Sequence, residues 1–340
     1  MQLIQPLFTG PLDIIGDVHG EYGALCSLLF RLGYDGNGNH PEGRRLVFVG
    51  DLVDRGPDSI AVAYLVRHLI QRGNAQAVIG NHELNLLRPS KKGGPFPDKR
   101  HGNHWFQSLP EALVKGSSQI NFQNLANEQN RQDLSAFFRT LPVALERDDL
   151  RVVHACWDQQ SIDKIRARNT PLQDLFIEYE EQIIDSHPAQ STKIEQDLRE
   201  QNLNPIKVIT SGLEKRAEEP YEAGGKVRHL KRVQWWKSYT GPMVVFGHYW
   251  RRREANPNVD PETLSPPDKK TVPYLFEDTP MFSTEGSTMC IDYSVGGRYY
   301  ERHKANKEGD FGCYLAAFRT YKSPGRYTLL FDDGKEIQLI

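Results

Sequence analysis

The stretch "GDVHG" at residues 16–20 directly follows the apolar run "LDII" at residues 12–15. The apolar run predicts a short buried strand, so Asp17 and His19 are expected where that strand ends. A glycine at each end of the stretch lets the backbone turn sharply there. Taken alone, the stretch is more typical of a turn with a polar face than of a ligand pair. Its meaning depends on whether partners for Asp17 and His19 occur further along the chain.

The segments around this stretch alternate between strand and helix patterns. Apolar residues at helical spacing predict helices at 21–34 and 59–73, and β-branched and aromatic runs predict strands at 44–51 and 75–83. This order and spacing indicate βαβ units with parallel strands. Since the polar residues follow the strands, they are expected to gather along one edge of the sheet, where open α/β sheets bind ligands.

The rest of the chain is less regular. Further elements are predicted as helices at 110–140 and 158–203, strands at 150–157, 207–212 and 242–250, and a C-terminal β-meander that completes a second sheet. Stretches rich in glycine, proline and charge predict loops at 89–109 and 251–280. We expect a single α/β (α+β) domain over residues 1–340. The insertions are expected at 89–109 (a loop or lid), 158–203 (helical) and 251–280 (a loop), where they shape substrate access.

Composition excludes several functional classes. The chain has 340 residues, 38% of them hydrophobic, and a net charge of −2, which allows a core and gives no general polyanion-binding surface. Four cysteines without a CxxC pair predict reduced, mostly buried thiols. No signal peptide and no run of roughly 18 apolar residues is visible. We expect a soluble, cytoplasmic protein without a membrane partner.

Partners for Asp17 and His19 do follow other apolar strands. They are Asp51 and Asp54 in "GDLVDRG" (50–56), Asn81 and His82 in "GNHE" (80–83), His154 in "VVHACW" (152–157) and His248 in "VVFGHYW" (244–250). A strand end is rigid, so oxygen and imidazole ligands there can be held in fixed positions. Two divalent cations about 3.5–4 Å apart that share one carboxylate use such a set to hydrolyse phosphoesters. We expect Mn²⁺, with Fe, Zn²⁺ or Ni²⁺ as alternatives, in preference to Ca²⁺.

This ordered set of motifs resembles the phosphoprotein phosphatase branch of the calcineurin-like metallophosphoesterases. That family is marked by GDxHG, GDxVDRG and GNHE, which are specific as a set within residues 16–83, and by two later histidines. The chain is also similar to bacterial diadenosine tetraphosphatase-like enzymes and to the phosphatase module of bacterial RNA-repair proteins. The resemblance implies a β-sandwich flanked by helices, with a metal site at the strand ends.

The resemblance also implies a role for each matched residue. The implied metal ligands are Asp17 and His19 for the first ion, Asp51 as the bridge, and Asn81, His154 and His248 for the second ion. His82 would protonate the leaving oxygen, and Asp54 would orient its imidazole. Arg55 would grip the phosphate through its guanidinium fork. Asp292, in "CIDYSVGG" (290–297), matches an aspartate of the RNA-repair relatives and is expected to restrain Arg55.

The implied reaction is direct, in-line attack of a metal-bridging hydroxide on phosphorus, without a covalent intermediate. The leading substrates are phosphomonoesters, either phosphoproteins or small phosphorylated metabolites. Dinucleoside polyphosphates such as diadenosine tetraphosphate are the main alternative, so a nucleotide substrate stays open although nucleic acid is not expected. RNA end-healing is disfavoured because no kinase or ligase module is fused to the chain. A non-catalytic metal-binding scaffold is the remote alternative, because such proteins typically lose a ligand or the acid.

Two charged sites keep more than one interpretation. Protein phosphatases have a second phosphate-binding arginine, for which the candidates are Arg228, Arg232 and the run Arg251 to Arg253. Arg55 has the alternative of pairing with a carboxylate such as Glu83, although phosphate binding is favoured. Glu83 itself is expected to support the site through hydrogen bonds and not as a ligand.

Other residues have a structural interpretation that outweighs the functional one. His101 and His104 lie in a loop without carboxylates, so metal ligation is not favoured. A core position is preferred for Trp235 and Trp236 over stacking on a base. A solvated loop is preferred over polyphosphate contact for four basic residues, Lys91, Lys92, Lys99 and Arg100.

Overall fold

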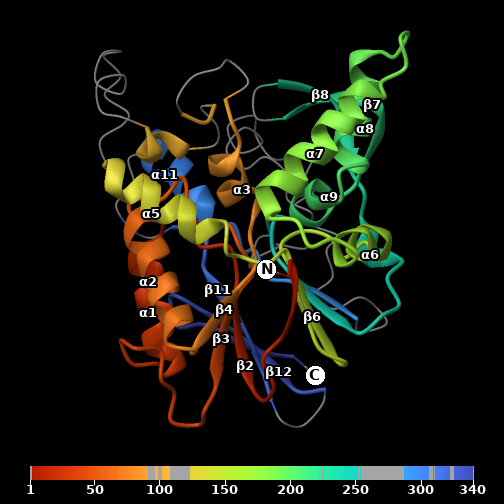
Figure 1. The fold of residues 1–340 in the computed structure, drawn as a ribbon. Helices are drawn as coiled ribbons and strands as arrows, with labels where there is room; N and C mark the ends of the chain where they lie inside the picture. The colour runs from red at the N-terminus through yellow and green to blue at the C-terminus, as the bar shows by residue number, and fades with distance from the viewer. Residues whose placement is uncertain are drawn as a thin grey trace.

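Two β-sheets form the centre of the molecule (Figure 1). The computed structural model describes residues 2–90, 96–98, 102–107, 123–223, 226–251, 253, 287–305, 309, 311–321 and 325–339. The six-stranded sheet has the order β13 (Glu336–Leu339), β12 (Tyr327–Phe331), β11 (Ala316–Thr320), β2 (Leu12–Ile15), β3 (Arg45–Phe48) and β4 (Ala75–Ala77). The five-stranded sheet has the order β1 (Ile4–Pro6), β5 (Ala144–Glu146), β6 (Leu150–Val153), β9 (Met243–Phe246) and β10 (Thr288–Cys290).

Helices lie on both sides of the paired sheets (Figure 1). One group comprises α1 (Tyr22–Leu32), α2 (Ser59–Gln71), α3 (Asn81–Leu87) and α5 (Glu128–Phe138). The other group comprises α6 (Gln159–Arg166), α7 (Leu172–Asp185), α8 (Lys193–Asn202) and α9 (Pro205–Ser211), followed by the hairpin of β7 (Glu214–Ala223) and β8 (Lys226–Arg232). The remaining described helices are α11 (Arg298–Ala305) and the 3-10 turns η1 (Asn103–Phe106), η2 (Trp235–Lys237) and η4 (Val295–Gly297).

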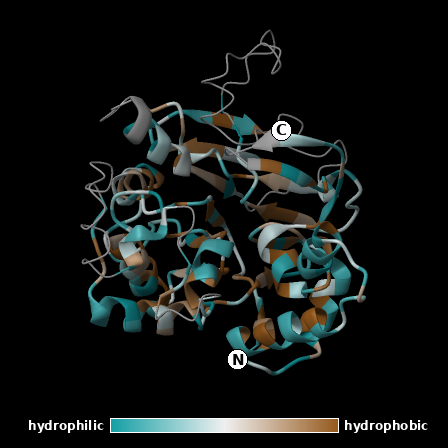
Figure 2. Cartoon of the chain, turned by 90° about the horizontal axis from the view of Figure 1, so that it is seen from above, coloured by the Kyte–Doolittle hydropathy of each residue, from teal (hydrophilic) through white to brown (hydrophobic). Residues whose placement is uncertain are grey.

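The alternation of side chains along the strands explains this layering. Leu12 and Ile14 of β2 belong to a buried cluster that also contains residues such as Val152 of β6, so the two sheets pack face to face. Ile15 and Phe48 point the other way, into the cluster formed with the helices. Figure 2 shows the hydrophobic residues concentrated in the strands and on the inner helix faces. The predicted α/β class and the β-sandwich are confirmed.

Parallel pairing brings the sequence motifs to one edge, as predicted. β2 pairs in parallel with β3, and β3 with β4, with α1 and α2 as the crossover helices. In the second sheet β6 pairs in parallel with β9, and β9 with β10. The segments that follow β2, β3, β4, β6 and β9 carry the candidate ligands, so one edge of the sandwich collects them all.

Three predictions of secondary structure are wrong. The strand predicted at 75–83 ends at Ala77, and residues 81–83 begin helix α3. Residues 207–211 form part of helix α9 and not a strand, because Asn204 caps the helix N-terminus and Pro205 occupies its first position; Gly212 is the C-cap. The C-terminal strands do not complete a second sheet: β11 pairs antiparallel with β2 and β12 follows it, whereas β10 joins the other sheet. The β7–β8 hairpin had no counterpart in the sequence prediction, which ended its helical segment at residue 203. Helices α6, α7 and α8 lie where the 158–203 helical segment was expected.

The described parts of the chain contain no helix with the length and apolar character needed to cross a membrane. Three of the cysteines, Cys156, Cys290 and Cys313, are buried, and all four are free thiols, as the sequence predicted.

A buried ion network joins β2 to β11 and to the segment before β3. Asp13 of β2 is fully buried and accepts hydrogen bonds from Arg44 Nε at 3.1 Å, Arg319 Nε at 2.8 Å and Tyr34 Oη at 2.9 Å. The Asp13→Ala variant should lose about 3–5 kcal/mol of unfolding free energy, because it leaves the buried Arg44 guanidinium without its carboxylate. Urea denaturation measures this loss.

The matched control is Asp149→Ala, which breaks the exposed ion pair with Arg147. It should cost no more than about 1 kcal/mol, since water screens exposed pairs. Equal losses in the two variants would contradict the buried-network interpretation.

Candidate metal centre

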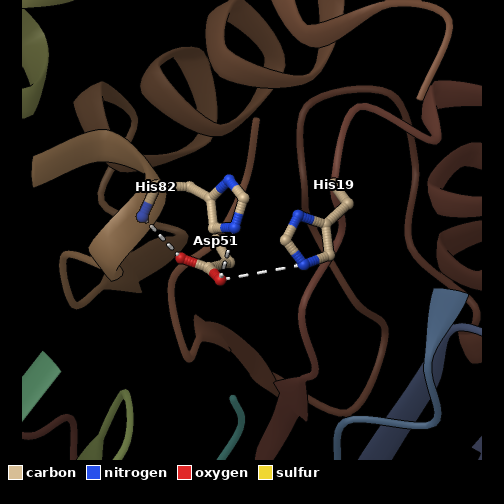
Figure 3. A group of neighbouring side chains, drawn as sticks. All are labelled: His19, Asp51 and His82. Carbon is tan, nitrogen blue, oxygen red and sulfur yellow. Dashed lines mark hydrogen bonds and ion pairs between the residues drawn. The ribbon is translucent and has the colours of Figure 1, made fainter. Parts of the chain in front are cut away.

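Asp51, at the end of β3, lies at the centre of the candidate site. Its Oδ2 is 3.7 Å from His19 Nε2 and 3.7 Å from His82 Nε2. Its Oδ1 is 3.3 Å from His154 Nε2 and accepts a hydrogen bond from the His82 backbone N–H at 2.9 Å. Figure 3 shows the carboxylate between the rings of His19 and His82. One carboxylate therefore contacts three histidines from three different parts of the chain.

The described ligand atoms form two groups that share Asp51. His19, Asp51 and His82 offer atoms within 4.8 Å of one another, and so do Asp51, His154 and His248. Two adjacent ions bridged by one carboxylate require this arrangement. The grouping of His82 with His19 is geometrically compatible with ligation, although the sequence resemblance assigns His82 to acid catalysis.

Asp17 and Asn81 complete the cluster. Asp17 Oδ2 lies 3.9 Å from His19 Nε2, and the Asp17 carboxylate accepts the His248 backbone N–H at 3.1 Å. Asn81 Oδ1 lies 3.2 Å from His154 Nε2. The fold thus brings together all six residues that the sequence singled out as ligands.

Backbone carbonyls orient two of the candidate ligand histidines. His19 Nδ1 lies 3.1 Å from the Val53 carbonyl, and His154 Nδ1 lies 2.8 Å from the Val49 carbonyl. A carbonyl only accepts, so each Nδ1 carries a proton, and each Nε2 lies on the side of the ring that faces Asp51. This is how metal-binding histidines are usually held.

Several carboxyl groups are buried close together in the cluster, so a bound cation would stabilise their ionised forms. Burial raises the pKa of Asp17 well above its usual value, and the nearby carboxylates of Asp292 and Asp51 add to that effect. Burial likewise raises the pKa of Asp292 to about 6, and its Oδ2 is buried without a hydrogen-bond partner. Burial opposes ionisation of Asp51 as well, but His154 and His82 hold its pKa well below the usual range. A divalent cation would relieve this crowding, so the donor set fits a metal.

Backbone strain is concentrated at this site. Among the described residues, positive φ outside glycine occurs at His19, Asp51, Asp54, Arg55, His248 and Ser294. Five of these are residues that the sequence placed in the site, and the sixth, Ser294, donates its backbone N–H to Asp292, another residue of that set. Left-handed backbone costs an L-residue roughly 1–2 kcal/mol, which the surrounding packing must offset. Strain of this kind is typical of functional sites.

Two glycines permit the close approach of the ligands. A Cβ atom at Gly247 would lie 1.9 Å from Asp17 Oδ1, and one at Gly80 would lie 2.2 Å from Asp51 Oδ1. Neither contact leaves room for a side chain, so both positions require glycine. The glycines beside the ligands therefore have a steric reason to be there.

His82, Asp54 and Arg55 form a second layer over the cluster. His82 Nδ1 lies 2.6 Å from Asp54 Oδ2, which turns Nε2 toward the site. Arg55 extends Nη1 to His19 Nε2 at 2.7 Å and Nη2 to His82 Nε2 at 3.2 Å, and its guanidinium lies 4.7 Å from the centroid of the Trp250 ring. Arg55 thus faces the ligands, and the alternative of an ion pair with Glu83 is not observed.

The Glu83 carboxylate supports the site by accepting hydrogen bonds from backbone N–H groups. Oε2 accepts from Asp51 N at 3.0 Å and Gly80 N at 2.9 Å, and Oε1 accepts from Leu52 N at 2.7 Å and Val53 N at 3.2 Å. Burial, followed by repulsion from Asp51, raises its pKa to about 7. These contacts agree with the supporting role expected from the sequence.

Two tryptophans at the site escaped the sequence interpretation. Trp105 is buried and donates its indole N–H to Asp54 Oδ1 at 2.7 Å. Trp250 lies under Arg55, two residues after His248. The position next to the His248 motif was a signal for Trp250. Trp105 had no signal, because it lies in a polar segment without periodicity.

The remaining candidates have the following positions. Trp235 and Trp236 are 6% and 0% exposed, in agreement with the core interpretation. His104 belongs to neither ligand group formed by the described residues. Arg228 lies exposed on β8, whereas Arg251 and Arg253 bind the C-terminal part of the fold through Cys290 O and Asp333. The positions of His101, Lys91, Lys92, Lys99, Arg100 and Arg252 lie outside the described residues.

Comparison with known proteins identifies the family of this chain. The calcineurin-like phosphoesterase family matches residues 10–248. The bis(5'-nucleosyl)-tetraphosphatase PrpE of Halalkalibacterium halodurans is 52% identical over 79 residues, which cover 22% of this chain and 32% of that protein. The PrpE of Bacillus subtilis is 46% identical over 86 residues, covering 24% of this chain and 35% of that protein. The matched segment thus spans about a third of the length of these relatives.

A solved structure supports the fold alone. A point mutant of a cold-active protein tyrosine phosphatase aligns with a TM-score of 0.50 and 14% identity, covering 100% of this chain and 83% of that one. The family match covers more than half of the 340 residues and includes the motifs of residues 16–83 together with His154 and His248. This chain therefore belongs to the calcineurin-like phosphoesterase family.

Proposed function

We propose that the chain is a binuclear metal-dependent phosphoesterase that hydrolyses phosphomonoesters, either phosphoproteins or small phosphorylated metabolites. The observation that carries this proposal is the position of Asp51 in both ligand groups. A single carboxylate between two clusters of imidazoles serves a pair of ions better than one ion.

The six clustered residues would hold the ions. We assign Asp17 and His19 to one ion, Asn81, His154 and His248 to the other, and Asp51 to both. When bound, the ions, for which Mn²⁺ is our first choice, would supply Lewis-acid activation of water and neutralise charge on the phosphoryl oxygens. The buried carboxyl groups of Asp17 and Asp51 are the protein's own contribution, since the fold holds their oxygens close to the histidine nitrogens before any ion binds.

His82 would hold the proton that the leaving oxygen needs. Its Nδ1 is held by Asp54, which fixes the ring and directs Nε2 into the site. Arg55 would bind the phosphate, since its two terminal nitrogens already face the site beside His19 and His82. The Asp292 carboxylate attracts the Arg55 guanidinium, which supports the expected restraining role.

Arg232 is our choice for the second phosphate-binding arginine. It ends β8 in the hairpin that follows the helical insertion, and its Nη1 is buried without a hydrogen-bond partner. The positive charge of Arg232 acts on the cluster. Burial is the largest cause that lowers the pKa of His248, and the charge of Arg232 is the second largest. Nε remains tied to Glu214 at 3.4 Å, which leaves the terminal nitrogen available for a phosphate oxygen.

Dinucleoside polyphosphates are the second candidate substrate. The curated relatives that match at 46–52% identity are named bis(5'-nucleosyl)-tetraphosphatases, which favours a nucleotide. The match spans only about a third of their length, so most of those proteins lies outside the likeness. The metal cluster suits both candidates, because each reaction breaks a bond at a single phosphorus atom.

Metal removal and a substrate pair test the proposal. Treatment with a chelator should abolish hydrolysis of p-nitrophenyl phosphate, and Mn²⁺ should restore it better than Fe, Zn²⁺ or Ni²⁺. We expect kcat/KM for p-nitrophenyl phosphate to exceed that for diadenosine tetraphosphate by about tenfold, a difference of about 1.4 kcal/mol in the barrier. The reverse preference would establish the second candidate. Activity that survives complete metal removal would refute the binuclear proposal.

A further inference from the structure

A segment outside the sheets packs directly on the turn that carries Asp54 and Arg55. The Gly102 carbonyl accepts the Arg55 backbone N–H at 3.2 Å. Gln123 Nε2 bridges the two segments by donating to the carbonyls of Gly102 at 2.9 Å and Gly56 at 3.3 Å. The segment is therefore hydrogen-bonded to the backbone of the turn that carries Asp54 and Arg55. It does more than cover the site.

Trp105 extends this contact to the carboxylate of Asp54. Its side chain is 0% exposed, and its indole N–H donates to Asp54 Oδ1 at 2.7 Å. The other oxygen, Oδ2, lies 2.6 Å from His82 Nδ1. The Trp105 carbonyl in turn accepts the Ala126 backbone N–H at 2.7 Å, which anchors the residue. Trp105, Asp54 and His82 therefore form a continuous hydrogen-bonded chain, with one Asp54 oxygen used on each side.

We propose that Trp105 is a positioning residue that holds Asp54 so that His82 can deliver its proton. The inference rests on the acid role proposed for His82. The carboxylate torsion of an aspartate is broad, so a single hydrogen bond from His82 would leave Asp54 free to rotate. A donor on the second oxygen removes that freedom.

The chemistry of the indole suits this task. An indole N–H donates and cannot accept. Trp105 therefore cannot take the Nδ1–H hydrogen bond of His82 away from Asp54. A carboxylate has two oxygens, so Asp54 can accept from Trp105 on Oδ1 and from His82 on Oδ2 at the same time. Trp105 belongs to the segment around η1, which the sequence indicated only as a loop or lid, and the inference gives that segment a part in proton delivery.

The Trp105→Phe variant tests the inference, because it keeps an aromatic ring in the core and removes the donor. Acid assistance matters most for esters with a poor leaving group. We expect kcat to fall about tenfold for phenyl phosphate and less than about twofold for 2,4-dinitrophenyl phosphate, with KM and metal content unchanged. An equal loss on both esters would indicate a purely structural role and overturn the inference.

A double variant shows whether Trp105 acts through Asp54. Adding Trp105→Phe to Asp54→Asn should lower kcat for phenyl phosphate by less than about twofold further, since residues that act as a unit are non-additive. Multiplication of the two losses would contradict the inference. If melting shows that Trp105→Phe is unfolded, Trp105→Met takes its place in the same cycle, because methionine fills irregular gaps.

The matched control is Trp235→Phe. Trp235 is equally a buried tryptophan, and it donates its indole N–H to the Ala155 carbonyl at 2.9 Å. This variant should lose stability without any dependence on the leaving group. The His82→Asn variant distinguishes failure of the acid role of His82 from failure of the positioning role of Trp105. If its loss of kcat does not depend on the leaving group, the acid role fails. If His82→Asn shows that dependence and Trp105→Phe does not, only the positioning inference fails.

Discussion

The His82→Asn variant should lower kcat for phenyl phosphate by about 10³-fold while both metal positions stay filled. General acid catalysis is worth about 10²–10⁴-fold, and asparagine cannot supply the proton that the phenolate oxygen needs. Asparagine keeps a polar side chain of similar reach beside Asp54, whose Oδ2 is 2.6 Å from His82 Nδ1 in the wild type. The fold should therefore tolerate the change.

Steady-state kinetics and elemental analysis of the metal content measure this outcome. The matched control is His68→Asn, an exposed histidine of α2, which should retain full activity. The metal measurement decides between two roles, because His82 Nε2 also lies 3.7 Å from Asp51 Oδ2. Loss of an ion from His82→Asn would show that the residue is a ligand and refute the acid assignment.

The Asp51→Asn variant should lower kcat/KM by about 10⁴-fold or more and reduce the affinity for both ions. It removes the charge that the two ligand groups share. It also weakens the acceptor for the His82 backbone N–H, which lies 2.9 Å from Asp51 Oδ1. No other described ligand belongs to both groups, so no other ligand variant should lower both affinities equally.

Calorimetric titration with Mn²⁺ and elemental analysis measure the loss of metal. Thermal melting without metal checks the fold, since Glu83 would still bind the backbone N–H of residue 51. Asp163→Asn, at an exposed position on α6, is the matched control and should bind two ions. Retention of one tightly bound ion in Asp51→Asn would mean that the carboxylate is not shared.

The early part of the fold followed from local patterns. The helices at Tyr22–Leu32 and Ser59–Gln71 and the strands before Asp17 and Asp51 each bury one face or both, so hydrophobic spacing alone predicted them. Local patterns failed at residues 207–212, where β-branched side chains indicated a strand. The capping residue Asn204 and the tertiary packing of α9 outweighed that preference.

The partners of the strands could not be predicted in the same way. β11 pairs with β2 at a separation of about 300 residues, and nothing within "CYLAAFRTY" specifies that neighbour. The same holds for the hydrogen bond from Trp105 to Asp54, which joins two loops. Such contacts depend on how distant surfaces pack, and a local pattern carries no information about them.

The amino-acid pattern alone determined which ligands the chain offers and that each one stands at the end of a strand, because hydrophobic periodicity and glycine placement act over a few residues. Only the tertiary structure decided that His154 and His248 meet Asp51, that five site residues take left-handed backbone, and that Trp105 reaches Asp54. The physical reason is that these features depend on packing between segments that lie far apart in the sequence. That packing offsets the strain and the buried charge, which no short segment can do on its own.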